Sequence, residues 1–111
     1  MLAQFLDSLE KLSPVESACT LPSHGEPFPD HRAVIRSTIR HHEERCAEIA
    51  SQIAKKPMTA HELVLALWNR KLSAFHHNFA VFEILAHLEY MRRRGEATGE
   101  VEGATYWRIA A

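Results

Sequence analysis

A proline and a helix-capping sequence lie almost next to each other near the middle of this chain, and together they fix where one helix ends and another begins. Pro57 cannot lie inside a helix without removing a hydrogen bond and clashing with the preceding turn, so the helical pattern before it ends there. Thr59-Ala60-His61-Glu62 is a capping box, in which the Thr59 side chain accepts from the third helical N–H and Glu62 reaches back. The chain is therefore predicted to be mainly α, with two helices joined by a short turn.

Apolar residues spaced three and four apart predict a helix at four places along the chain. The first helix covers residues 2–12 and ends before a proline-rich, loop-like stretch at 13–29. A long helix follows Asp30, which is a suitable N-cap, and ends by Lys56. A third helix of about ten residues follows the capping box, and the fourth covers residues 74–94.

The sequence after the fourth helix predicts a β-hairpin. Arg92-Arg93-Arg94 and Gly95 suit a helix C-terminus, because cations favour the carbonyl end of the dipole and glycine adopts the left-handed conformation without strain. Short β-like runs follow at 98–101 and 105–109, joined through Glu102-Gly103-Ala104. A long helix, then helix, turn, helix and a two-stranded ribbon, is the order of a winged helix-turn-helix domain, which is the predicted fold.

The predicted core follows the apolar stripe of the fourth helix. Its aromatic residues continue into aliphatic ones, so we expect them to pack inside rather than to form a platform for stacking bases. Trp68, Tyr106 and Trp107 are expected to close the far side of this core and to pin the hairpin. The stripe comprises Phe75, Phe79, Phe82, Leu85, Leu88 and Met91.

Composition limits the classes of function. A chain of 111 residues, 46% of them hydrophobic, can bury a core without disulfides or a structural metal. Its net charge of −1 gives no field that would draw it to nucleic acid or an anionic membrane. No apolar stretch approaches the roughly 20 residues needed to cross a bilayer, and no signal peptide is recognisable. Cys19 and Cys46 are isolated, which favours a reducing compartment and a cytoplasmic location.

An ordered set of motifs resembles one protein family. Leu21-Pro22-Ser23-His24-Gly25-Glu26-Pro27-Phe28 resembles the Pro-Gly-His-Gly segment near the end of the metallo-β-lactamase-fold hydrolase domain. Four further segments are similar to motifs of the metallo-hydrolase branch that carries a C-terminal winged-helix domain: His41-His42-Glu43-Glu44-Arg45, Thr59-Ala60-His61-Glu62-Leu63, Ala86-His87-Leu88-Glu89 and Arg94-Gly95-Glu96. The first of these departs from the family's His-Arg-x-x-Arg, because His42 replaces an arginine.

The resemblance implies a C-terminal piece of a longer hydrolase. Residues 1–28 would end the metallo-β-lactamase domain, 29–56 would be a connecting helix, and 57–111 a winged-helix-like domain that shapes substrate access. The parent would hold two divalent cations, usually zinc, and a hydroxide that attacks an ester, thioester or phosphodiester. His24 matches the family's last metal ligand, although its spacing alone favours an exposed loop histidine. The family's His-x-His-x-Asp-His loop is not in this sequence, so the chain alone is expected to need no cofactor and to catalyse nothing by this route.

Two other functions stay open beside a partnership with the lactamase domain. A winged-helix nucleic-acid-binding module would use Arg92, Arg93 and Arg94 on phosphates, but residues 57–111 carry six basic and six acidic side chains, a poor footprint for DNA. We therefore expect no nucleic-acid partner, and the role of the three arginines stays open. A self-associating domain would instead form a homodimer through the apolar face Leu2, Phe5, Leu6 and Leu9.

Two alternative metal sites have weaker support. His42 and Cys46 are four residues apart on a predicted helix, but no third ligand lies at a suitable interval and Cys46 falls on the apolar stripe. His61-Glu62 begins like the zinc-protease motif H-E-x-x-H, yet the second histidine is replaced by Leu65. Glu62 is therefore predicted to cap a helix and not to act as a general base.

Overall fold

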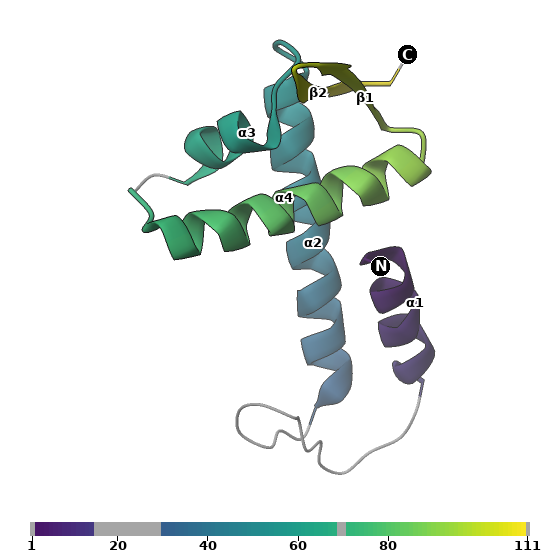
Figure 1. Ribbon diagram of the computed structural model, residues 1–111. Coiled ribbons are helices and arrows are strands. Elements are labelled where there is room, and N and C mark those ends of the chain that lie inside the picture. The colour runs from purple at the N-terminus through teal and green to yellow at the C-terminus, as the bar shows by residue number, and fades with distance from the viewer. Residues whose placement is uncertain (1, 15–29, 69–70, 111) are drawn as a thin grey trace. The chain divides into compact units, whose positions relative to one another are not determined.

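The computed structural model of the protein describes residues 2–14, 30–68 and 71–110. These residues are mainly helical, with one two-stranded antiparallel hairpin in the described part (Figure 1). The chain divides into two compact units, Met1–Glu43 and Glu44–Ala111, so that their boundary falls within a long helix. The elements are α1 (Leu2–Leu12), α2 (His31–Ile53), α3 (Ala60–Leu67), α4 (Ala74–Arg93), β1 (Ala97–Glu102) and β2 (Ala104–Ile109).

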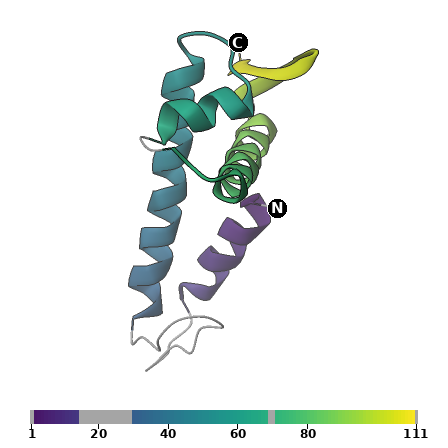
Figure 2. The ribbon, with the colours of Figure 1, turned by 60° about the vertical axis from the view of Figure 1, so that its left-hand side comes forward.

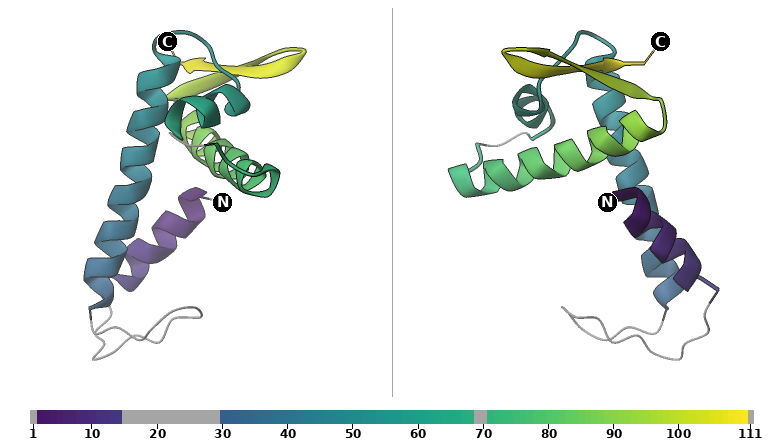
Figure 3. Two further views of the ribbon diagram at one scale, coloured as in Figure 1. Left: turned by 90° about the vertical axis from the view of Figure 1, so that its left-hand side faces the viewer. Right: turned by 45° about the vertical axis from the view of Figure 1, so that its right-hand side comes forward.

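The first unit contains α1 beside the N-terminal part of α2 (Figures 2 and 3). Asp30 acts as the predicted N-cap, because its Oδ1 accepts a hydrogen bond from the Ala33 N–H at 3.0 Å. The first turn of α2 also holds the end of α1: Arg32 Nε donates to the Ser13 carbonyl at 2.6 Å. This cation lies at the carbonyl end of α1, where the helix dipole favours positive charge.

The second unit confirms the predicted boundary between its first two helices. Thr59 Oγ1 accepts from the Glu62 N–H at 3.1 Å, and Glu62 Oε1 accepts from the Thr59 N–H at 3.0 Å. The residue between the proline and the cap has a further role, because Met58 forms an antiparallel bridge with Trp107. Met58 N–H donates to the Trp107 carbonyl at 3.0 Å and Trp107 N–H donates back at 2.8 Å. The turn before α3 therefore pairs, through this one residue, with the edge of β2 that does not face β1.

The fourth helix begins and ends as its sequence predicts. The Ser73 hydroxyl accepts from the His76 N–H at 3.2 Å and caps α4. Gly95 follows the helix with a positive φ of 75°. The N–H of Gly95 donates to the Arg92 carbonyl and that of Glu96 to the Met91 carbonyl, which is the Schellman arrangement. The chain then enters the hairpin, in which Gly103, at φ 77°, makes the turn.

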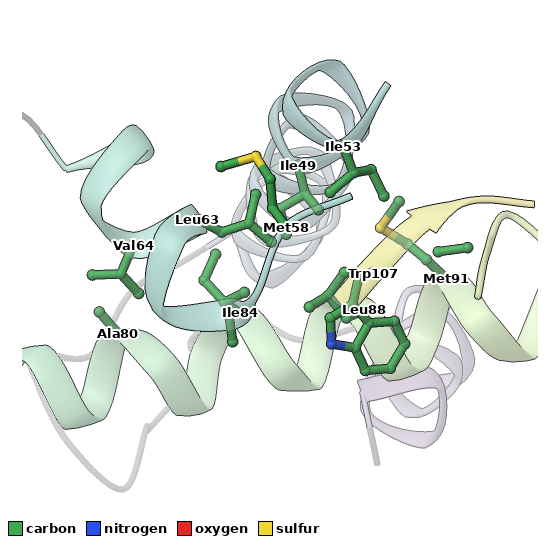
Figure 4. Close-up of a cluster of buried hydrophobic side chains, with 12 residues drawn as sticks. Ile49, Ile53, Met58, Leu63, Val64, Ala80, Ile84, Leu88, Met91 and Trp107 are labelled. Atoms are coloured by element: carbon green, nitrogen blue, oxygen red, sulfur yellow. The ribbon is translucent and has the colours of Figure 1, made fainter. Parts of the chain in front are cut away.

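The core of the second unit lies where α2, α3, α4 and β2 meet (Figure 4). Trp107 from β2 is 9% exposed, which confirms that it closes this core. Leu88 and Met91 are buried as predicted, whereas Trp68 is half-buried and packs on the cluster from outside. The largest fully buried aliphatic side chains of the cluster are Ile49, Leu63, Val64, Ile84, Leu88 and Met91.

The prediction that the phenylalanines of α4 lie in the core is wrong. Phe75, Phe79 and Phe82 are 67%, 60% and 69% exposed. Each residue advances the helix by about 100°, so a spacing of three falls about 60° short of a full turn. Repeated spacings of three therefore carry the apolar stripe around the helix. The residues at the two ends of the stripe, Phe75 and Met91, therefore lie on nearly opposite faces, and only the later part of the stripe is buried.

Candidate functional site

The described residues do not fit a metal centre. His24, the predicted metal ligand, lies outside them, so its role stays a prediction. Within residues 2–14, 30–68 and 71–110, no group of three or more His, Cys, Asp or Glu side chains could hold a metal ion. His42 packs edge-on against Phe5, with ring centroids 6.0 Å apart, and Cys46 packs against the core of the second unit. Among the described residues, no third metal-ligating side chain joins His42 and Cys46.

Most of the remaining histidines have structural contacts. His87 is 1% exposed, and its Nδ1 donates to the Glu83 backbone carbonyl at 2.7 Å, as expected for a packed histidine with a satisfied ring nitrogen. His76 Nδ1 lies 2.9 Å from the Ser73 hydroxyl beside the helix cap. His61 and His77 contact each other across α3 and α4, with Nδ1 of the first 2.9 Å from Nε2 of the second. None of these imidazoles forms a metal-ligating group with other described residues.

Arg45, the arginine of the His-Arg-x-x-Arg-like segment, connects three helices of the second unit. Its Nη1 donates to Glu48 Oε2 at 3.1 Å, and its Nε lies 3.6 Å from Glu83 Oε1 on α4. The guanidinium carbon lies 4.5 Å from the ring centroid of Trp68, at the end of α3. The side chain is only 16% exposed, so these contacts act in a partly desolvated place. Arg45 therefore positions α4 and Trp68 relative to the C-terminal part of α2.

We expect Arg45→Ala to lower the free energy of unfolding by about 2 kcal/mol, because it removes a half-buried stem, a cation–π contact and the partner of Glu83. Glu48→Ala is the matched control: Glu48 is 49% exposed and its loss should cost less than about 0.5 kcal/mol. Urea unfolding measures both values. Equal costs for the two variants would contradict the network.

The arginines at the end of α4 are paired within the chain. Arg92 and Arg93 both donate to Glu89, at distances down to 2.6 Å, and their hydrogen bonds lower the pKa of Glu89 to about 2. Arg94 bonds Glu96 at 2.7 Å and lies over the Tyr90 ring. Each of the three guanidiniums thus has a carboxylate partner, which reduces the positive field that a phosphate-binding patch needs.

An exposed aromatic face on α4 is the candidate interaction surface. Phe75, Phe79 and Phe82 are spaced by four and three residues and therefore lie along one side of the helix. The rings of Phe75 and Phe79 pack edge-to-face, with centroids 4.8 Å apart. Adjacent large apolar side chains exposed on one face mark an interaction site more often than isolated ones do. We call these three residues the α4 phenylalanine face.

The face predicted for dimerisation is mostly covered. Leu6 is buried, Leu2 and Leu9 are half-buried, and Phe5 is 47% exposed. The described part of the chain contains no helix long and apolar enough to span a membrane.

Comparisons with known proteins agree with the motifs. Residues 46–111 match the family model described as "Metallo-beta-lactamase-like, C-terminal domain". A probable metallo-hydrolase from Bacillus subtilis (strain 168) is 26% identical over 110 residues, which cover 96% of this chain and 33% of that protein.

Two solved structures show the same relation. A beta-lactamase domain protein from Burkholderia ambifaria superposes with a TM-score of 0.91 at 33% identity, over 98% of this chain and 33% of that one. A metallo-beta-lactamase family protein from Thermus thermophilus has a TM-score of 0.79 at 32% identity, over 96% and 33%. The chain spans about a third of the length of these relatives. Since the family model covers more than half of the sequence, this chain belongs to the metallo-beta-lactamase-like C-terminal domain family.

Proposed function

We propose that this chain is the C-terminal accessory region of a metal-dependent metallo-β-lactamase-like hydrolase, and that it shapes the access of substrate to an active site on the N-terminal domain. The observation that carries the proposal is the α4 phenylalanine face, which is 60–69% exposed. The relatives are about three times as long as this chain, which supports a partner domain in the same polypeptide. The helix, turn, helix and hairpin order of residues 57–111 supports a winged-helix-like module for this role.

The size of the exposed face suits an intramolecular contact between domains. An aromatic side chain buries 150–250 Å² when it is fully covered, and the three phenylalanines are 60–69% exposed, so they offer roughly 300–500 Å². Interfaces between domains of one chain bury roughly 600–1,500 Å². Polar residues around the three phenylalanines would supply the remaining interface area. A tethered partner also needs less contact area than a free one, because the linker supplies a high effective concentration.

The proposal assigns residues 1–28 to the end of the catalytic domain, 29–56 to the connecting helix, and His24 to its metal centre. When bound, two divalent cations, usually zinc, would acidify a bound water and polarise the substrate oxygen. The task of this chain would be to present one neutral imidazole nitrogen of His24. The remaining ligands would come from the N-terminal domain, because the His-x-His-x-Asp-His loop of the family is not in this sequence.

Side-chain footprinting tests the proposed partnership. Carbene labelling should modify Phe75, Phe79 and Phe82 readily in the chain alone and at least about fivefold less in the full-length hydrolase, since burial excludes the reagent. Trp107, which is 9% exposed, is the internal control and should be labelled weakly in both. Equal labelling of the three phenylalanines in the two proteins would overturn the proposal.

A further inference from the structure

A cavity of 340 Å³ lies between α3 and the start of α4, within the second unit. Its apolar wall includes Val64, Leu65, Trp68 and Leu72. Val64 is 1% exposed and belongs to the core, whereas Leu65 is 64% exposed at the surface. The wall therefore runs from the core to solvent, and its volume lies within the range typical of small-molecule sites. Neither the predicted metal site nor the α4 phenylalanine face uses these residues.

The polar groups of the cavity are basic or neutral. Lys71, His61, His77 and Asn78 contribute to its lining, and none of the residues that line it is an aspartate or glutamate. Lys71 makes no ion pair with a carboxylate in the described part of the chain. The lining also includes the first turn of α4, a 20-residue helix, where the helix dipole favours negative charge. Charge in this cavity is therefore complementary to an anion.

The two histidines hold each other in place. When both rings are neutral, one donates and the other accepts, so one of the two remaining ring nitrogens carries a proton. Their hydrogen bond joins Nδ1 of His61 and Nε2 of His77 at 2.9 Å, and the ring centroids are 4.8 Å apart. Within the described residues, the other ring nitrogen of each has no hydrogen-bond partner. A ring nitrogen that carries a proton can donate to a ligand oxygen, and the pairing fixes the orientation of both rings.

We propose that this cavity binds a small amphipathic monoanion, with an apolar chain against Val64, Leu65 and Trp68 and a carboxylate near Lys71 and the His61–His77 pair. The apolar wall supplies most of the contact area, and the basic groups orient the head. Few precisely placed polar groups in an otherwise apolar cavity are the usual composition of such sites. The inference is independent of the proposed function, because the lining of the cavity includes neither His24 nor any residue of the α4 phenylalanine face.

Octanoate is the probe, titrated into the chain while the indole N–H signals of Trp68 and Trp107 are followed by NMR. We expect a saturable shift of the Trp68 signal, with Trp107 unchanged because it is buried elsewhere in the core. 1-Octanol, which has the same chain without the charge, and acetate, which has the charge without the chain, should each bind at least about tenfold more weakly. No saturable shift of Trp68, or equal affinity for octanoate and octanol, would overturn the proposal.

Two pairs of variants locate the site. Leu65→Glu should abolish binding, while Val101→Glu, at a hairpin residue that is 78% exposed, adds the same charge outside the cavity and should leave affinity unchanged. Lys71→Ala should weaken octanoate about fivefold and leave octanol unchanged, with Lys55→Ala as its control.

Phe79→Ser distinguishes the cavity from the α4 phenylalanine face. Phe79 does not line the cavity, so this variant should keep full affinity for octanoate. Loss of binding in Phe79→Ser with normal binding in Leu65→Glu would place the anion on that face and contradict the proposal. Leu65 and Phe79 are both exposed, so unchanged thermal unfolding is expected to confirm that each variant is folded.

Discussion

Ile84→Ala is expected to lower the free energy of unfolding by about 3 kcal/mol, whereas Phe82→Ala, two residues earlier on the same helix, should lower it by less than about 0.5 kcal/mol. Ile84 is 0% exposed and lies inside the cluster of the second unit (Figure 4), so its truncation leaves a cavity. Phe82 is 69% exposed, so its truncation removes little buried contact. The larger side chain, Phe82, is therefore expected to cost less when truncated than the smaller one, Ile84.

Urea unfolding followed by tryptophan fluorescence measures this difference. A domain of this size has a total stability of roughly 5–15 kcal/mol, so a loss of about 3 kcal/mol is easily resolved when the m-values agree. Leu85→Ala is a useful intermediate, because this side chain is 37% exposed and should fall between the two. A cost for Phe82→Ala as large as that for Ile84→Ala would show that the phenylalanines belong to the core after all.

The element boundaries could be predicted because each depends on a few neighbouring residues. The capping box at Thr59 and Glu62 is complete within four positions, and its two hydrogen bonds form as the sequence predicts. Gly95 ends α4 with the backbone conformation that glycine favours. The hairpin turn at Gly103 is equally local. β1 extends its predicted run by one residue at each end, and β2 extends its run by one residue at the start.

The buried face of α4 could not be predicted in the same way. Its apolar positions surround much of the helix, and only the packing of α2 and α3 decides which of them are covered. The core takes Ala80, Ile84 and Leu88, spaced by four, in place of the phenylalanines. Periodicity shows that a helix is amphipathic, but a stripe that winds around the axis does not identify one face.

Contacts between distant segments account for the other features that could not be predicted from the sequence. The bridge between Met58 and Trp107 and the ion pair of Arg45 with Glu83 join residues far apart in the sequence, and no local motif marks either. The cavity beside Trp68 is likewise lined by residues of α3 and α4 together with Lys71 and Leu72, which precede α4. The family resemblance identified the segments that contain Arg45 and His87, but their structural contacts required the fold.

The exposure of the three phenylalanines and the greater length of the relatives both favour a second domain as the partner of this face. Three large aromatic side chains on one helix face would be a liability in a free domain, because such patches promote association. In a chain that matches about a third of its relatives' length, the same face is expected where a second domain packs. The homodimer alternative through Leu2, Phe5, Leu6 and Leu9 lacks such an argument, since only Phe5 of that set is exposed.

His24→Ala in the full-length hydrolase is expected to lower hydrolysis by at least about 100-fold and to reduce the metal bound per chain, since a catalytic site needs its full set of protein ligands to hold a divalent cation. His24 lies outside the described residues, and the prediction depends on its match to the family's last metal-binding histidine. Metal content by mass spectrometry and hydrolysis of a model ester should fall together. Added zinc should restore part of both, because a weakened site refills by mass action.

His41→Ala is the matched control for this experiment. His41 is exposed on α2, and its ring contacts His42, 5.6 Å away between centroids, so its loss removes an imidazole of the chain without touching a proposed ligand. Metal content and hydrolysis should both stay at the unsubstituted level. If His24→Ala kept its full metal content, the imidazole would not be a ligand, and an exposed loop histidine would account for it; if His41→Ala lost metal as well, the effect would come from the connecting helix.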